Sequence, residues 1–199
     1  MQKAKRKSRK LIAWQSPGFT LLELVVTIAI AGIIFTILGA IFLAQMQFFA
    51  IQNAIAETQV HAFRALDTTG GFMSSADAVV AGHVINGTTY SSTDTIAVLE
   101  LPSIDSTGNI ISNAHDYVAI GEDPANASQF MFDIQAAPGS TRLNGKFSKA
   151  QLVDKLIFRY NDSTPANATA VDLYIRTSEN ARGRTITTPL GKIYYLGAQ

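Results

Sequence analysis

The pattern of apolar and polar positions is dominated by one long apolar run near the N-terminus. Residues 24–44, LVVTIAIAGIIFTILGAIFLA, include no charged side chain. A helix over this run would be about 30 Å long, which is the thickness of the hydrocarbon core of a bilayer. The apolar core of a cleaved secretory signal is usually shorter, at roughly 7–15 residues. The run therefore predicts a membrane-spanning helix, in preference to a buried helix of a soluble domain.

A helical pattern continues beyond this run, because residues 45–67 contain neither proline nor glycine. Apolar side chains recur there at intervals of three, four and seven, which is typical of an amphipathic helix. The stripe consists of Phe48, Ile51, Ile55, Ala62 and Leu66, widened by Phe49, Val60 and Phe63. Gly70 and Gly71 follow and are expected to end the helix.

These observations predict one helix from about Phe19 to about Asp67, roughly 70 Å long. Its first half, residues 19–44, would lie in a membrane. Its second half, residues 45–69, would pack against a globular domain. A coiled coil is the alternative for the second half, and we disfavour it because a long strand-like sequence follows and needs a surface to pack on.

The remainder, residues 70–199, is typical of antiparallel β structure. Runs of Val, Ile, Tyr, Phe and Thr alternate with clusters of Gly, Asn, Asp, Ser and Pro. The expected strands are 78–86, 94–101, 115–121, 129–135, 153–160, 170–177 and 192–196. Two hairpins are expected, one joining 117–120 to 130–134 and one joining 156–160 to 171–175. A long helix laid on an antiparallel sheet is an α+β fold.

Charge is distributed very unevenly along the chain. Residues 1–18 hold six basic residues and no acid, whereas the rest holds ten basic and all 15 acidic residues. A basic stretch of this kind could be a nucleic-acid arm, the start of a secretory signal, or the positive-inside flank of a membrane helix. The apolar run favours the last reading, with the leader in the cytoplasm and the C-terminal domain outside. The acidic remainder gives no support to nucleic-acid binding.

Glu23 lies inside the apolar segment that begins at Phe19. A carboxylate near a membrane core costs a few kcal/mol and calls for a partner. The nearest upstream cation is Lys10, and no basic residue follows within 40 positions. Cleavage between Gly18 and Phe19 would create a new α-amino group four residues before Glu23. That amine could pair with Glu23 of the same helix or of a neighbouring copy.

The segment SPGFTLLELVVTIAIAGI, after a short basic leader, resembles the prepilin signal of type IV pilins and type II secretion pseudopilins. Six positions match the motif: Gly18, Phe19, Thr20, Leu21, Leu22 and Glu23. The resemblance implies that a membrane peptidase cuts after Gly18 and N-methylates Phe19. It also implies that Glu23 neutralises the amine of an adjacent subunit during assembly.

The same resemblance implies the pilin fold, and it implies partners. These are the prepilin peptidase/methyltransferase, other pilin or pseudopilin subunits and, indirectly, a membrane platform and an assembly ATPase. The protein would begin as a single-pass precursor in the bacterial cytoplasmic membrane and end in a periplasmic or cell-surface filament.

One feature departs from many major pilins, which carry a proline near the middle of the apolar helix. This chain has no proline between Pro17 and Pro102. It has Gly32 and Gly39, which share a helix face and would permit close helix packing, or are merely tolerated there. The missing proline resembles minor subunits, and the order of strands is similar to that of J-type minor pseudopilins and W-type minor pilins.

Candidate chemistry in residues 70–199 is sparse. The whole chain has no cysteine, and its three histidines (His61, His83 and His115) have no metal-ligand spacing. Acidic residues at the expected turns are interpreted as solvated, as is the segment RTSENARGRTIT. The four N-x-S/T matches (Asn86, Asn126, Asn161 and Asn167) are interpreted as exposed loops. We therefore predict no catalytic residue, no metal site and no cofactor, and a structural rather than enzymatic role.

Two other classes of function stay open at this level. One is a membrane-anchored enzyme or binding module whose signal is not cut, which would need a pocket with convergent polar groups in residues 78–199. The other is a major pilin, which would be abundant in the filament, or a DNA-uptake pilin, which would need a basic patch on an otherwise acidic domain.

Overall fold

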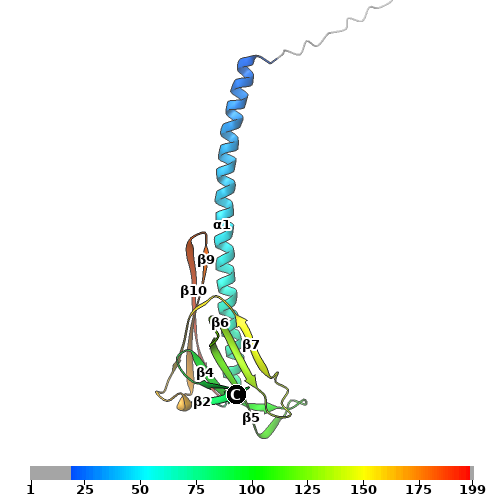
Figure 1. Cartoon of the computed structure of the whole chain (residues 1–199), viewed down its shortest axis with the longest axis vertical. Coiled ribbons are helices and arrows are strands. Elements are labelled where there is room, and N and C mark those ends of the chain that lie inside the picture. The colour runs from blue at the N-terminus through cyan, green and yellow to red at the C-terminus, as the bar shows by residue number, and fades with distance from the viewer. Residues whose placement is uncertain (1–18, 198–199) are drawn as a thin grey trace, which may run out of the picture. The chain divides into compact units, whose positions relative to one another are not determined.

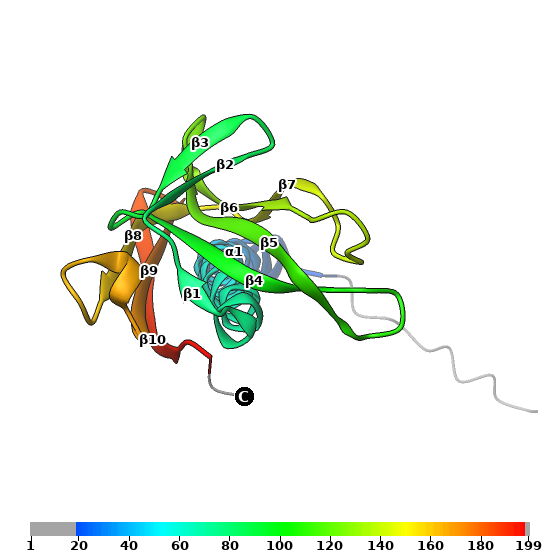
Figure 2. The same cartoon turned by 90° about the horizontal axis from the view of Figure 1, so that it is seen from below.

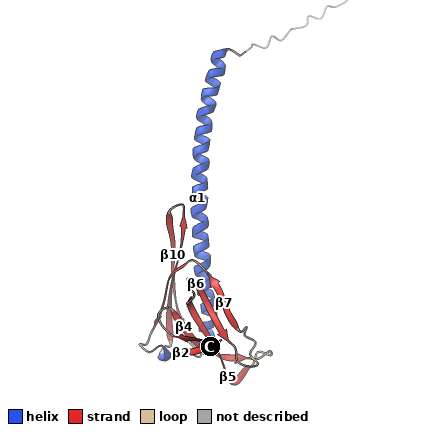
Figure 3. Cartoon of the chain, in the orientation of Figure 1, coloured by secondary structure: helices blue, strands red, loops and turns tan. Residues whose placement is uncertain are grey.

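The computed structural model describes residues 19–197, so the basic leader and Gly18 lie outside the described residues. The chain divides into two compact units, one ending at Met46 and one beginning at Gln47. Helix α1 (Leu21–Ser75) contributes to both, and it is drawn in blue in Figure 3 and labelled in Figure 1.

The expected helix end at Gly70–Gly71 is wrong, since α1 continues to Ser75. Gly70 faces the ring of Tyr194, where a Cβ atom would lie 3.0 Å from Cε1. Met73, one turn further on, is fully buried. The packing of this last turn outweighs the cost of the glycines, about 1 kcal/mol each relative to alanine.

The predicted apolar stripe of the second half is also wrong in part. Its large side chains Phe48, Phe49, Val60 and Phe63 are exposed, at 44–61%. The buried positions are mostly small: Ala54, Thr58, Ala62, Ala65, Leu66, Thr69 and Met73. Small side chains allow the sheets to approach the helix backbone closely, so the contact face follows residue size as well as hydrophobicity.

The β structure consists of ten strands and one 3₁₀ turn within the described residues. The strands are β1 (Ala78–Val79), β2 (Gly82–Ile85), β3 (Thr88–Ser91), β4 (Ile96–Ile104), β5 (Ile110–Asp123), β6 (Asn126–Gln135), β7 (Gly145–Ala150), β8 (Val153–Tyr160), β9 (Ala170–Ala181) and β10 (Arg184–Tyr195). The turn η1 (Pro165–Asn167) lies between β8 and β9. Every pairing is antiparallel.

These strands form three sheets. The largest has the order β1-β4-β5-β6-β7, the second has the order β10-β9-β8, and β2 pairs with β3 alone. Both predicted hairpins are confirmed, because β5 pairs with β6 and β8 pairs with β9. The α+β fold is confirmed as well: an N-terminal apolar helix whose later part packs on antiparallel sheets, consistent with a pilin-like fold.

Several strands differ from the prediction. The segment 78–86 divides into β1 and β2, while β3 and β7 were not expected. The segment 176–187, interpreted as a solvated loop, is part of the β9–β10 hairpin, whose turn holds Arg182 and Gly183 at positive φ angles of 53° and 78°. The polar sequences of β3, β7 and the tip of the β9–β10 hairpin did not indicate strands. The backbone hydrogen bonds of a paired strand form even where its side chains are polar.

The main core lies between the later part of α1 and the two larger sheets. Figure 2 shows the five-stranded sheet and the three-stranded sheet on different sides of the helix. Hydroxyl groups of the smaller sheet donate to helix carbonyls: Thr177 Oγ1 to Thr58 O at 2.8 Å, and Tyr194 Oη to Leu66 O at 2.6 Å. These bonds fix the position of β9 and β10 along the helix.

The loop between β6 and β7 is held by one buried carboxylate. The Asp116 side chain, on β5, is fully buried and accepts hydrogen bonds from Ser103, Ser140 and the backbone N–H of Ala137, all at 2.7 Å. Arg142 Nη1 lies 2.6 Å from Asp116 Oδ2. Burial alone would raise the pKa of Asp116, but these donors together hold it below its ordinary value.

Candidate assembly segment and the polar groups of the β domain

The N-terminus of α1 carries the predicted site residues that the structure describes. Thr20 immediately precedes the helix, and Phe19 before it is 78% exposed. The backbone N–H of Thr20 donates to Glu23 Oε2 at 3.4 Å, and the backbone N–H of Glu23 donates to Thr20 Oγ1 at 3.3 Å. This reciprocal arrangement is a capping box, with both bonds longer than the usual range of about 2.7–3.2 Å.

The capping box gives Glu23 a local partner that the sequence analysis missed. The T-x-x-E spacing of Thr20 and Glu23 is the usual signature of this motif and could have indicated it. A carboxylate in the first turn is also favourable because the helix dipole is positive there. Glu23 therefore caps its own helix, and its pairing with a new terminus at Phe19 stays a prediction.

The side chains of the first unit form an almost continuous apolar surface. From Leu21 to Leu43 the large apolar residues are 48–81% exposed. The helix is long and apolar enough to cross a membrane, with a mean hydropathy of 2.7 over its most apolar window. Apolar side chains exposed in this way need lipid or protein to cover them.

Gly32 and Gly39 lie in this segment, seven residues apart and hence on one helix face. A Cβ atom added at either position would meet no atom within 4 Å. Within the unit itself, nothing described requires glycine at these positions. Thr36, between them, donates its hydroxyl to Gly32 O at 2.8 Å, so this polar group is hydrogen-bonded within the helix. Their predicted role in helix packing stays a prediction.

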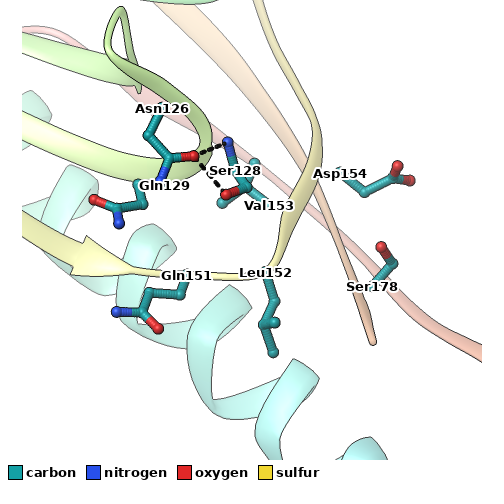
Figure 4. A pocket seen from close by; sticks show the side chains of 8 residues that line it. All are labelled: Asn126, Ser128, Gln129, Gln151, Leu152, Val153, Asp154 and Ser178. Carbon is teal, nitrogen blue, oxygen red and sulfur yellow. Dashed lines mark hydrogen bonds between the residues drawn. The ribbon is translucent and has the colours of Figure 1, made fainter. Parts of the chain in front are cut away.

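The β domain holds a shallow polar pocket of about 430 Å³, shown in Figure 4. Three of its six polar side chains are already hydrogen-bonded or ion-paired. Asn126 Oδ1 accepts from the backbone N–H and the hydroxyl of Ser128, and Asp154 pairs with Arg176 at 2.5 Å. Leu152, at a φ of +62°, forms the short connection from β7 to β8. The pocket offers no nucleophile paired with a base.

The three histidines lie at separate places. His61 Nδ1 accepts a hydrogen bond from the Gln151 backbone N–H at 3.2 Å, which also fixes the β7–β8 connection. His83 stacks on Tyr117 with ring centroids 3.6 Å apart, and His115 lies 3.1 Å from Glu100. Across residues 19–197, no three His, Asp or Glu side chains are grouped closely enough to hold a metal ion.

One buried carboxylate oxygen has no hydrogen-bond partner among the described residues: Oε2 of Glu179, on β9. Burial, and then the charge of Glu57 on α1, raises the pKa of Glu179 above its ordinary value. Two acids therefore approach each other where the β9–β10 hairpin meets the helix.

Comparison with known proteins agrees with the geometry of the N-terminus. A family model described as the prokaryotic N-terminal methylation motif matches residues 16–39. The chain carries a type IV pilin-like signal. The match contains Gly18, Phe19, Thr20, Glu23, Gly32 and Gly39, and it ends before the β domain begins. No curated protein and no solved structure matched the chain.

A pilin-like signal has two consequences for the site. It implies processing by a prepilin peptidase and assembly with other pilins. It also places Gly18, which lies outside the described residues, within a recognised motif. Proteins with this signal are typically structural, which agrees with the expectation of a structural role.

Proposed function

We propose that this protein is a subunit of a type IV pilus or a type II secretion pseudopilus, and that it is a minor rather than a major subunit. The precursor waits in the cytoplasmic membrane with its basic leader in the cytoplasm and its β domain outside. The peptidase cuts after Gly18 and methylates Phe19. The mature chains then assemble through their apolar helices, with Glu23 pairing to the α-amino group of a neighbour.

The methylation motif at residues 16–39 carries this proposal. Three features support it: a helix able to span a membrane, a carboxylate one turn from the cut, and exposed apolar side chains from Leu21 to Leu43 that require covering. The absence of a proline between Pro17 and Pro102 supports a minor subunit.

Deleting the prepilin peptidase tests the proposed pathway. In cells that have the assembly machinery, we expect the chain in the sheared or periplasmic filament fraction. Without the peptidase, it should stay in the membrane at full length, because the leader holds it there. The fractions are measured by immunoblot, with an integral membrane protein as control. Equal recovery in the filament fraction with and without the peptidase would contradict the proposal.

A further inference from the structure

A groove of about 330 Å³ lies between α1 and β7, the edge strand of the five-stranded sheet. Three aromatic rings form its floor. Phe132 lies 5.3 Å from Phe72 and 5.5 Å from Phe147, measured between ring centroids. Leu143, in the loop before β7, lines the groove and is 74% exposed. The volume is sufficient for one or two large apolar side chains.

A cation stands over this floor. Lys149 Nζ lies 5.6 Å from the centroid of the Phe132 ring. Lys149 is the extra residue of a β-bulge, because Phe130 pairs with Ala150 while Met131 pairs with Ser148. Bulges are known to redirect side chains. No ion pair of Lys149 occurs among residues 19–197, whereas Arg142, the other cation of the groove, pairs with Asp116.

The groove continues along the helix. A second hollow of about 410 Å³ shares Lys149 and is lined by Arg64, Asp67 and Thr68 of α1. Arg64 also makes no ion pair with any described residue, and Asp67 is the one acid of this hollow. Residues 47–199 as a whole hold ten basic and fourteen acidic residues. The two hollows thus hold two cations, Arg64 and Lys149, that make no ion pair among the described residues, and one acid, Asp67.

We propose that this groove binds an acidic segment of a different protein, which packs an aromatic or branched aliphatic side chain against the partly buried rings of Phe72 and Phe147 and places a carboxylate beside Lys149. The apolar floor provides the buried contact, and the unpaired cations favour a carboxylate at its rim. The partner does not add a strand to β7, because lysines and a bulge protect a sheet edge from pairing. The proposal does not depend on cleavage after Gly18.

Site-specific photo-crosslinking tests it in cells with the full-length chain. A photoreactive phenylalanine analogue at Leu143 should crosslink to another protein, and mass spectrometry should place the crosslink within about three residues of an Asp or Glu. The same analogue at Ile110, which is 66% exposed and on another part of the sheet, is the control for random collision.

Charge variants then identify the contact. Lys149→Glu should lower the crosslink yield at least about tenfold, and Lys149→Arg should preserve it. Lys155→Glu, an exposed charge reversal on β8, should leave the yield unchanged. Near-ultraviolet circular dichroism checks that each variant is folded. The proposal is overturned by the absence of a crosslink, by a crosslink to a second copy of this chain, by a partner peptide without acids, or by equal yields in wild type and Lys149→Glu.

Discussion

Replacing Glu23 with alanine is expected to leave cleavage after Gly18 intact and to abolish assembly. The variant removes the negative charge that would meet the α-amino group of a neighbouring Phe19. Losing one partner of a charge pair in low dielectric commonly costs about 2–5 kcal/mol, which is a factor of roughly 30 or more in association. Immunoblots of the membrane and filament fractions measure both steps.

The capping box at the start of α1 makes a sharper control possible. Glu23→Gln keeps an acceptor for the Thr20 backbone N–H but removes the charge, whereas Thr20→Ala removes the hydroxyl cap and leaves the charge. If charge pairing drives assembly, Glu23→Gln should fail to assemble, as Glu23→Ala is expected to, and Thr20→Ala should assemble. If Glu23→Gln assembles normally and Thr20→Ala does not, Glu23 acts as a helix cap and the pairing hypothesis is wrong.

Replacing Asp116 with alanine is expected to destabilise the β domain by about 3–5 kcal/mol. The carboxylate is fully buried and pairs with Arg142, which is 16% exposed. Its loss leaves that guanidinium and three other donors without their acceptor. Because all six tyrosines of the chain lie between Tyr90 and Tyr195, their near-ultraviolet circular dichroism reports unfolding of this domain in denaturant.

An exposed ion pair provides the matched control. Asp154 pairs with Arg176 at 2.5 Å, but both side chains are about 40% exposed. Asp154→Ala should cost at most about 1 kcal/mol, since water screens the charges. Similar losses for Asp116→Ala and Asp154→Ala would show that the Asp116 contacts do not hold the loop.

The Asp116 effect should also depend on pH. The folded-state pKa of Asp116 lies below its unfolded value of about 4. Its contribution is therefore fully present above about pH 4 and is lost as the pH falls through the folded pKa. The stability difference between wild type and Asp116→Asn should shrink below about pH 4, and a difference that stays constant would contradict this assignment.

The sequence predicted the features that depend on long or repeated patterns. The apolar run of residues 24–44 indicated the membrane-type helix, and alternation in LIFRY and VDLYIR indicated the β8–β9 hairpin. Features that depend on contacts distant in the chain could not be predicted. The continuation of α1 past Gly70 depends on packing with Tyr194, and the buried side of α1 depends on how closely the sheets approach Ala62 and Ala65.

The candidate site also combines features that local sequence patterns predict with features that depend on distant contacts. The motif that contains Gly18, Phe19 and Glu23 is local and could be found from the residues alone. The link between Thr20 and Glu23 is equally local, and its spacing signals it. The groove at Lys149 could not be found in this way, because Phe72, Phe132 and Phe147 are separated in the sequence and the β7 bulge that holds Lys149 is set by strand pairing.

Determining the N-terminus of the membrane-bound protein tests the central claim most directly. In cells with an active prepilin peptidase, mass spectrometry should find a chain that begins at Phe19 and carries one additional methyl group on its α-amino nitrogen. A chain that keeps residues 1–18 in those cells, or one that begins at Phe19 without methylation, would contradict the account.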